Sequence, residues 1–591
     1  MTRAGEVPQT WAPAPGARLL LGLAAAAVAF AAADTYVVVL ALPDMMSSVG
    51  LAVDELQRAA PIVSGFLLGY VAMLPLIGRI ADLRGRVPVL VGSLVVFALG
   101  SLVTAAAYDL PSMVAGRFLQ GVGGGGLVPA TLALVADMYP PSHRGVPLGV
   151  VGAVQELGSV VGPLYGALVL AAADWEEIFW INLAVGLVLA AVLHRTSGDP
   201  ARVSHLPRDP VGAVLAVLAV ACLLLVMLEP DVLAKGITTG LVFLPIVGES
   251  RWLSPLALTL FTLLIALLLR CWVASAPLLD LRQWGTVAKR ADLVGAGLLA
   301  LSLSGIILAF ASADPEVQVF SPAGPWMLAG SAVAAILFWW RNRRTSNPLI
   351  PRGAFARTPA WGALLVSFFV GAALIAALVD IPIFARVSVY PDSQLMAALV
   401  LVRLLVALPV GAVLGGYLTR RVPAGVVTAA GMGLAAGGFA WMAQWGLDSL
   451  EHPVATVPLV MTGLGFGLAL APVNAALLAA TEDAVHGVTS AMLVVARMVG
   501  MLVGISALTT IGLRRYYAVQ VDLAEPSDVC GARTQCAEYT TLLKEAGLAQ
   551  LQTVFLGAAV CALVAAAVAL LVFHHAQTRG VSAAEALRQA G

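Results

Sequence analysis

The segment Gly78-Arg-Ile-Ala-Asp82-Leu-Arg-Gly85-Arg86 connects two apolar runs of the sequence, near 59–78 and 88–107. A helix of about 20 apolar residues is long enough to cross a bilayer, so this segment is the turn between two predicted spans. Its glycines permit a tight turn, and its three arginines favour the cytoplasmic side of the membrane. The carboxylate of Asp82 can cap or pair with the end of a neighbouring helix, where backbone N–H groups favour an anion.

The composition of the whole chain agrees with a membrane protein. Of the 591 residues, 60% are hydrophobic and 11% are charged, whereas a soluble domain carries about 25% charged residues. The 33 basic residues balance 33 acidic ones, so no net positive field attracts a polyanion. We therefore predict an all-α polytopic membrane protein, and we exclude a soluble enzyme and a nucleic-acid-binding protein.

Sixteen apolar runs are predicted to span the membrane, in a six-four-six arrangement. The predicted units are an N-terminal six-helix bundle (1–200), a linker of two helical hairpins (201–350) and a C-terminal six-helix bundle (351–580). The last bundle contains an outer loop at 514–552, and residues 581–591 form a cytoplasmic tail. The predicted spans are 18–42, 59–78, 88–107, 113–136, 146–171, 178–194, 210–228, 253–272, 293–311, 325–340, 359–384, 394–418, 423–444, 456–479, 487–513 and 552–573.

The loop charges predict the orientation of the chain. Cytoplasmic loops carry an excess of Lys and Arg, and most of these residues fall on one side when both termini are placed inside. The first apolar run has no cleavage-site pattern, so we expect it to be retained as a span. The prediction is a multi-pass plasma-membrane protein with both termini in the cytoplasm.

The linker contains an internal repeat. Asp209-Pro-Val-Gly-Ala opens the seventh span and Asp292-Leu-Val-Gly-Ala opens the ninth. Ala276-Pro-Leu-Leu follows the eighth span and Asn347-Pro-Leu-Ile follows the tenth. The pattern indicates a tandem duplication of one two-helix unit, with chance similarity between apolar runs as the alternative.

Two further motifs lie inside predicted spans. The fourth span contains Arg117-Phe-Leu-Gln120-Gly121, and the fifth contains Gly152-Ala-Val-Gln-Glu156-Leu-Gly158-Ser-Val-Val-Gly162-Pro163-Leu-Tyr-Gly166. Glycines about four residues apart let helices approach closely, and a proline bends its helix. We therefore expect the Glu156 carboxylate to face a closely packed surface or a cavity.

Taken in order, these motifs resemble those of the major facilitator superfamily. The segment 78–86 is similar to its gating signature between helices two and three, 117–121 to its helix-four signature, and 152–166 to its antiporter signature. Asp34-Thr-Tyr-Val-Val-Val-Leu-Ala-Leu-Pro43 is similar to the first helix of its drug:proton antiporters. The resemblance implies the major facilitator fold, with two six-helix bundles around a central site. The chain departs from the family at Leu83 and Val87, which replace basic residues, at Arg403, where an uncharged residue is expected, and in its four linker helices.

A narrower resemblance is to the triacylglycerol exporters that mycobacteria have within this superfamily. It rests on 34–39, on 155–166 and on Val495-Ala-Arg497-Met-Val-Gly-Met-Leu-Val-Gly504. It implies a lipid cargo, a periplasmic lipid-carrier lipoprotein as partner, and an inter-domain ion lock between Glu156 and Arg497. The alternative for that pair is two unrelated residues, each satisfied locally.

Charged residues inside apolar spans are functional candidates because burying them costs several kcal/mol. Asp34 has no basic residue within a helical turn of its own sequence, and we predict that Asp34 and Glu156 take part in proton coupling. A structural hydrogen-bond acceptor is the alternative for Asp34. Arg117 is expected in a structural or proton-coupling network, Asp380 near the outer interface, and the sequence names no partner for Arg403.

The long connector at 514–552 is predicted to be a helical extension. No helix breaker follows the preceding span before Pro526, and 538–552 has near-helical spacing of apolar residues leading into the last span. A disulfide between Cys530 and Cys536 suits an outer, oxidising side. The functional interpretation is an extension that guides lipid or docks a lipoprotein, and the alternative is a passive loop.

The function predicted from sequence is proton-coupled export of triacylglycerol-like lipid by alternating access. The alternatives are a multidrug:proton antiporter for small amphipathic compounds and a receptor or scaffold that transports nothing. The sequence has no Gly-rich nucleotide loop with Lys, no zinc-ligand spacing and no nucleophile–base pair. We therefore expect no catalytic residue, metal or cofactor, no nucleic-acid partner, and a monomer.

Overall fold

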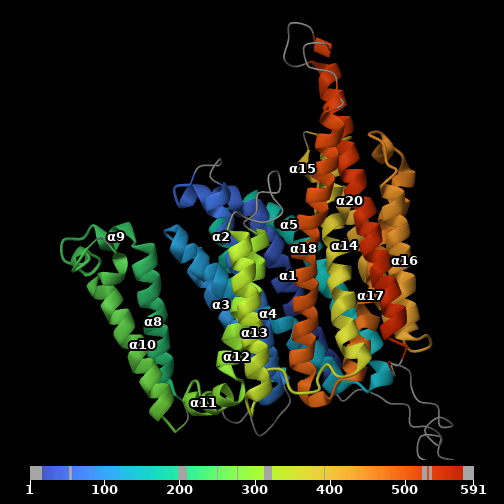
Figure 1. The fold of residues 1–591 in the computed structure, drawn as a ribbon. Helices are drawn as coiled ribbons and strands as arrows, with labels where there is room; N and C mark the ends of the chain where they lie inside the picture. Colours follow the sequence, from blue (N-terminus) through green and yellow to red (C-terminus); the bar gives the residue numbers. More distant parts are fainter. Residues whose placement is uncertain are drawn as a thin grey trace, which may run out of the picture.

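The chain forms a bundle of long, roughly parallel helices (Figure 1). The computed structural model describes residues 16–51, 56–196, 209–248, 250–275, 277–311, 323–391, 393–521, 523, 529–530, 536–574 and 576. Within these ranges sixteen α-helices have 19 residues or more, and each coincides with one of the sixteen predicted spans. The predicted helical order of the chain is therefore confirmed.

The sixteen helices fall into three consecutive groups. The N-terminal half comprises α1 (Ala17–Ser48), α2 (Leu56–Arg84), α3 (Arg86–Ala105), α4 (Leu110–Met138), α5 (Gly145–Leu170) and α6 (Trp175–Thr196). The linker comprises α8 (Pro210–Leu228), α9 (Asp231–Ala234), α10 (Pro255–Val273), α11 (Leu281–Arg290), α12 (Leu293–Ala311) and α13 (Gly324–Arg344). The C-terminal half comprises α14 (Thr358–Val387), α15 (Gln394–Leu418), α16 (Ala424–Met442), α17 (Thr456–Ala480), α18 (His486–Val521) and α20 (Ala537–Val572). Short 3-10 turns connect them at Pro141–His143, Gly240–Val242, Arg251–Leu253, Ser449–Glu451, Pro453–Ala455 and Asp483–Val485.

Most of these helices are long and apolar enough to cross a membrane. In the described ranges thirteen meet that condition individually, and the bent pair α11 and α12 raises the number to fourteen. The two others are α5, whose described apolar stretch covers only Gly145–Gln155, and α13, whose last turn holds three arginines. The structure therefore agrees with a membrane protein of fourteen to sixteen spans.

Small residues set the packing inside both halves. A Cβ atom at Gly121 of α4 would collide with the carbonyl oxygen of Phe66 on α2. In α5, Gly158 and Gly162 pack in the same way against the backbone of α1, and in α18, Gly500 and Gly504 pack against the backbone of α14. The glycines of the motifs thus permit the close helix approach that was predicted, and the two halves use equivalent pairs of helices for it.

The two linker hairpins share one structural device. Asp209 accepts a hydrogen bond from the backbone N–H of Gly212 (2.9 Å) and pairs with Arg270 (3.0 Å). Asp292 accepts one from the N–H of Gly295 (3.1 Å) and pairs with Arg341 (2.8 Å). Each buried aspartate therefore ties the start of its hairpin to the end. This agreement in position and partners supports the predicted duplication.

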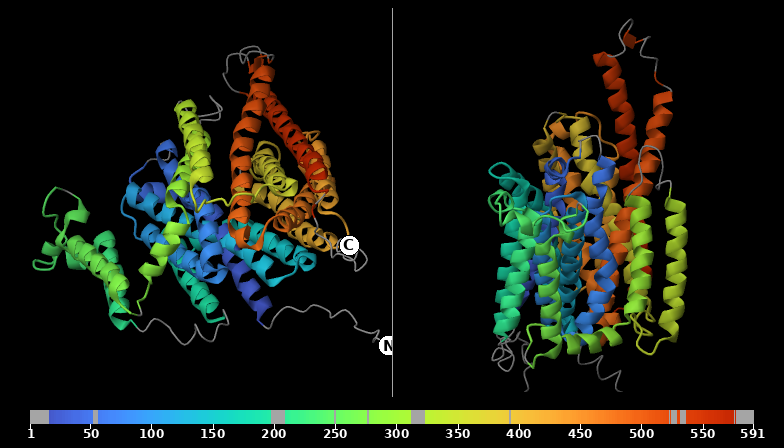
Figure 2. Two further views of the ribbon diagram at one scale, coloured as in Figure 1. Left: turned by 60° about the horizontal axis from the view of Figure 1, so that its bottom comes forward. Right: turned by 90° about the vertical axis from the view of Figure 1, so that its left-hand side faces the viewer.

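The hairpins occupy different places in the molecule. The α12–α13 hairpin packs through α12 on α2 and α18, one helix from each half. The α8–α10 hairpin stands at one side of the bundle (Figures 1 and 2). It is connected to the rest through α11 and, at its other end, through the contact of Arg251 with the ring of Tyr108. The chain thus carries one docked hairpin and one peripheral hairpin of the same design.

The last two long helices form an extension beyond the rest of the bundle (Figures 1 and 2). Both α18 and α20 have 36 residues, which corresponds to about 54 Å, whereas the hydrocarbon core of a bilayer is about 30 Å thick. The predicted helical continuation past 513 is confirmed as far as Val521, and the predicted helix over 538–552 lies within α20. Cys530 and Cys536 form the predicted disulfide.

Candidate functional site

The turn between α2 and α3 clamps the two halves together at one end. Asp82 accepts hydrogen bonds from the backbone N–H groups of Gly487 (2.7 Å) and Val488 (3.0 Å), in the first turn of α18. The helix N-terminus stabilises this carboxylate, as the sequence predicted. Gly78 makes the approach possible, because a Cβ atom there would lie 2.6 Å from the carbonyl oxygen of Gly487.

Arginines surround this clamp. Arg86 pairs with Asp82 (2.5 Å) and with Asp137 at the end of α4 (3.3 Å). It also donates a hydrogen bond to the carbonyl oxygen of Asp483 (3.2 Å), just before α18. Gly85, between the two helices, has φ +97°, a conformation that favours glycine. Asp82 and Arg86 thus both contact α18 or the turn before it, while the gating role of Gly78, Asp82, Gly85 and Arg86 stays a prediction.

A second contact joins the halves at the same end. In this contact α5 meets α15 so closely that a Cβ atom at Gly145 would collide with the backbone of Gly416. One turn further along, Gly149 lies against the carbonyl oxygen of Ala412. Both halves are therefore in contact at the end that carries the arginine-rich turns, on the side opposite to the α18–α20 extension.

A buried polar network lies within the N-terminal half. Asp34 of α1 pairs with Arg117 of α4 (2.8 Å), and each residue is 1% exposed. The sequence predicts an isolated Asp34, because no basic residue lies within a helical turn of it. The fold, however, places Arg117 beside it from 83 positions away in the chain. Asn182 of α6 donates a second hydrogen bond to Asp34 (2.5 Å).

The remaining polar groups of this network complete the helix-four motif. The Arg117 guanidinium donates a hydrogen bond to Gln120 (2.7 Å) and lies 4.6 Å from the centre of the Phe66 ring. Gln120 in turn donates to the hydroxyl of Ser101 on α3 (2.8 Å). Arg117 therefore belongs to a buried network, as predicted. Sequence reasoning missed Asn182 and Ser101, whose only signal is a neutral polar residue in an apolar run.

A cavity of about 300 Å³ lies between the two halves. It is formed by α1, α2, α4 and α5 on one side and by α14 and α18 on the other. Its described lining is apolar or aromatic except for Gln155 and Arg497. The lining residues are Val28, Ala31, Ala32, Val63, Phe66, Leu67, Tyr70, Val71, Val128, Gln155, Leu374, Ile375, Leu378, Arg497, Met498, Met501, Leu502 and Ile505.

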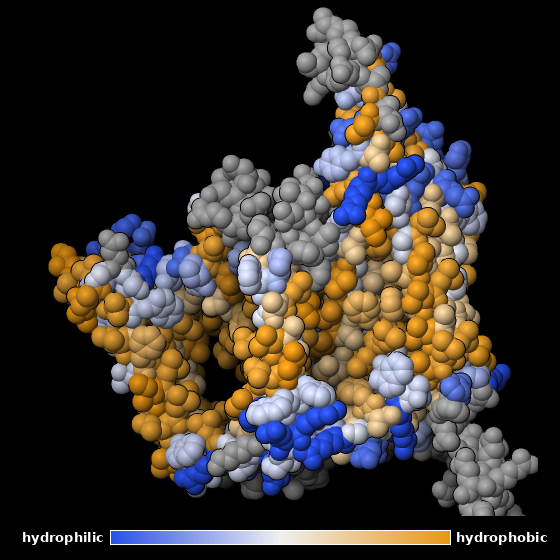
Figure 3. Space-filling view, viewed as in Figure 1, coloured by the Kyte–Doolittle hydropathy of each residue, from blue (hydrophilic) through white to orange (hydrophobic). Residues whose placement is uncertain are grey.

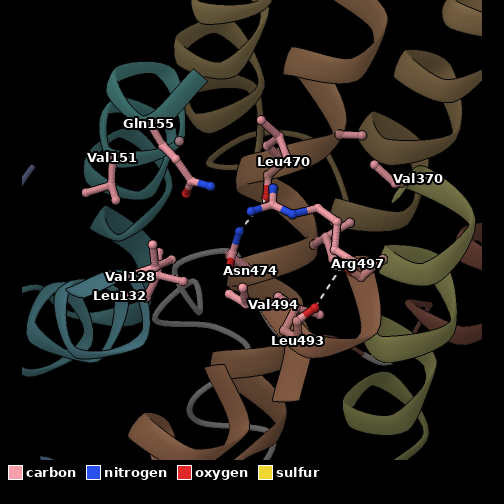
Figure 4. A pocket seen from close by; sticks show the side chains of 14 residues that line it. Val128, Leu132, Val151, Gln155, Val370, Leu470, Asn474, Leu493, Val494 and Arg497 are labelled. Carbon is pink, nitrogen blue, oxygen red and sulfur yellow. Dashed lines mark hydrogen bonds between the residues drawn. The ribbon is translucent and has the colours of Figure 1, made fainter. Parts of the chain in front are cut away.

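Val128, Gln155 and Arg497, which line the cavity, also line a pocket of about 30 Å³ (Figure 4). Arg497 of α18 points into this pocket, toward Asn474 of α17, and Gln155 of α5 reaches toward it from the other half (Figure 4). The structure therefore places Arg497 where the two halves meet. The side chains of Glu156 and Pro163 lie outside the described part of the structure.

The structure also shows the environment of two other charged residues of the C-terminal half. Asp380, expected near the outer interface, is 5% exposed within the core of that half. Arg403, for which the sequence named no partner, donates a hydrogen bond to the hydroxyl of Thr456 at the start of α17 (3.1 Å). In the described residues no group of three or more His, Cys, Asp or Glu side chains is arranged to hold a metal ion.

Comparisons with known proteins agree with this architecture. The family model described as the Major Facilitator Superfamily matches residues 24–340. A triacylglyceride transporter of Mycolicibacterium hassiacum is 36% identical over 503 residues, which cover 83% of this chain and 78% of the relative. Those of Mycolicibacterium smegmatis and Mycobacterium tuberculosis are 33% and 34% identical, covering 92% and 86% of this chain and 86% and 85% of the relatives.

The fold has a counterpart among solved structures. The crystal structure of the human organic anion transporter MFSD10 matches with a TM-score of 0.54 and 14% sequence identity. The match covers 94% of this chain and all of that chain. At this identity the likeness concerns the fold alone.

Proposed function

Because this chain belongs to the Major Facilitator Superfamily, whose members are transporters and not enzymes, we propose that it exports triacylglyceride or a lipid of similar bulk across the plasma membrane. The observation that carries the proposal is the cavity between the halves, whose described lining is apolar over almost its whole extent. Acyl chains lose no hydrogen bonds on entering such a cavity. The similar transporters of mycobacteria are named for triacylglyceride.

The proposed transport cycle alternates between two arrangements of the halves. The present structure is closed around Asp82 and Gly487, and its cavity residues on α2 and α18 lie beyond this clamp, toward the extension. The arginine-rich end faces the cytoplasm in our proposal, together with both termini. Release of the clamp would open the cavity toward the inner side, where lipid enters.

Proton coupling is proposed to run through the Asp34 network. Asp34 is the carboxylate that holds Arg117 on α4 and Asn182 on α6, so a proton on Asp34 would remove the charge that fixes both helices to α1. A change of protonation thereby biases one arrangement of the N-terminal half over another. A multidrug antiporter would use the same coupling but would need to accommodate a cationic cargo beside Arg497.

The extension is proposed to receive lipid on the outer side. The α18–α20 pair rises beyond the other helices, and α18 also lines the cavity through Met498, Met501 and Ile505. Helix α18 therefore runs without interruption from the cavity to Val521 in the extension. A periplasmic lipid-carrier lipoprotein is the partner that we propose for this extension, and the transporter itself is proposed to act as a monomer.

The proposal that the cavity binds lipid can be tested by filling the cavity with a larger side chain. Leu378 lines the cavity, and Leu378→Trp adds volume that a long acyl chain would otherwise occupy. We expect this variant to lose most transfer of fluorescent triacylglyceride from proteoliposomes to external acceptor particles under a pH gradient. Ile383→Trp on the same helix is the matched control, because Ile383 is 43% exposed on the outside of the bundle. Ethidium efflux with no triacylglyceride transfer by the wild-type protein would instead identify a multidrug antiporter.

We also propose that Glu156 and Arg497 form an ion lock between the halves. Arg497 points to the interface, and Gln155, the neighbour of Glu156, lines the same pocket. Removing one partner of a buried pair costs about 3–5 kcal/mol because the other charge is stranded. Glu156→Gln combined with Arg497→Gln should therefore be no less stable than the worse single variant. Thermal unfolding of the four proteins measures this, and strictly additive losses would contradict the pairing.

A further inference from the structure

The outer end of the peripheral hairpin exposes an unusual set of aliphatic side chains. Residues 229–254 connect α8 to α10, and several large apolar residues in this loop point away from the protein. Ile237 is 95% exposed and Val232 is 88% exposed. Leu241, Leu244, Ile246 and Val247 are also exposed. Exposed apolar patches of more than a few hundred Å² are rare on soluble surfaces and mark sites of contact.

This loop is an ordered structure with its own hydrogen bonds. Thr239 bonds through its hydroxyl to the carbonyl oxygen of Leu233 (2.7 Å), and the N–H of Ile246 bonds to the carbonyl oxygen of Leu253 (3.1 Å). Phe243, within the loop, is buried. The loop thus buries its aromatic residue Phe243 and leaves the aliphatic side chains Val232 and Ile237 exposed.

The position of the loop relative to the bilayer indicates that the loop contacts lipid. Helices α8 and α10 have 19 residues each, which corresponds to about 28 Å, close to the hydrocarbon thickness of about 30 Å. The loop begins where these spans end, so it lies at the membrane surface. In Figures 1 and 3 the loop remains far below the tip of the α18–α20 extension, and its apolar surface continues that of the hairpin.

The charges of the loop also favour a lipid surface. Lys235 pairs with Asp231 (2.8 Å), and Arg251 pairs with Glu229 (3.0 Å). The whole loop has three acidic and two basic residues, so it presents no strong charge to a protein partner. Arg251 also lies 4.3 Å from the centre of the Tyr108 ring, in the turn between α3 and α4, so the loop is tied to the outer surface of the N-terminal half.

We propose that residues 232–247 insert their aliphatic side chains into the outer leaflet of the membrane. The loop thereby fixes the depth of the α8–α10 hairpin, which has few other contacts with the bundle. This role is independent of the cargo, so it stands or fails separately from lipid export.

The test uses a fluorescent label at Ile237. Ile237→Cys is made in the full chain after the free cysteines Cys222, Cys271 and Cys561 are replaced by Ala, with the disulfide retained. An environment-sensitive dye is attached, and the protein is reconstituted in phosphatidylcholine vesicles with or without doxyl-labelled lipid. We expect strong quenching by the doxyl lipid, a blue-shifted emission, and severalfold weaker quenching by aqueous iodide than at the reference site.

The reference site is Glu451→Cys, in the exposed outer turn between α16 and α17. Equal iodide quenching at both sites, with no effect of doxyl lipid at 237, would overturn the proposal. Shielding at 237 that occurs only when a purified lipoprotein is added, again without lipid quenching, would assign the loop to a protein partner and would also overturn it. Because Ile237 makes almost no contacts, its replacement should leave the fold unchanged.

Discussion

Asp34→Asn should abolish lipid transport driven by a pH gradient. The substitution removes the negative charge that faces Arg117 at 2.8 Å in a site where both residues are 1% exposed. It also removes the group that can carry a proton, so a gradient would no longer bias the two arrangements of the halves. Transfer of triacylglyceride by purified protein in proteoliposomes, with the interior and exterior at different pH, measures the effect.

A loss of folding must be separated from a loss of coupling. An unpaired Arg117 costs about 3–5 kcal/mol, so the single variant is expected to be destabilised. Asp34→Asn combined with Arg117→Gln removes both charges and should recover much of the thermal stability. We expect this double variant to remain inactive under a pH gradient. Wild-type rates in either variant would show that Asp34 carries no coupling proton.

Replacing residues 519–546 with a short Gly-Ser linker should abolish lipid delivery and leave the bundle intact. The replacement removes the outer parts of α18 and α20, which rise beyond the membrane-sized helices. The contacts that join these helices nearer the bundle remain, such as Gly512 against Val554 and Gly557 against Leu508. The measurement is lipid export at matched membrane abundance.

A smaller replacement is the control for this prediction. Exchanging only residues 523–535 shortens the tip and removes Cys530, and with it the disulfide, but retains both helices to their described ends. We expect that variant to export lipid. Unchanged export by the protein that lacks 519–546 would exclude a transport role for the extension. Equal loss in both variants would assign the role to the tip and not to the helices.

Local patterns predicted the parts of the structure that depend on neighbouring residues. The α18–α20 extension was predictable because no helix breaker interrupts 514–521 and because 538–552 has helical spacing. The capping role of Asp82 was also predictable, since a carboxylate beside a helix N-terminus is favourable wherever that helix comes from. The sequence could not show that the helix would be α18.

Contacts between distant helices were not predictable from one sequence. The Asp34–Arg117 pair joins residues that are far apart in the chain, and each was interpreted separately. Asn182 and Asn474 are uncharged, so nothing distinguished them from other polar residues in apolar spans. The exposed face of the loop at 232–247 was not predictable for another reason: the sequence places the end of the span at 228, as the structure does, but it does not show which of the apolar residues that follow are exposed.

The duplicated hairpin has a consequence for how such a chain can change in evolution. Each copy of the Asp–Gly–Arg device joins the start of a two-helix hairpin to its end, so the chain enters and leaves the hairpin at the same side. Adding a copy therefore returns the polypeptide to the side from which it started, and the inside and outside of every later helix keep their identity. A single added pass would instead invert α14 to α20 and carry the clamp partner of Asp82 to the wrong face. The unit that this linker repeats is thus one of the few insertions that a two-halved transporter can accept in its middle without reversing its second half.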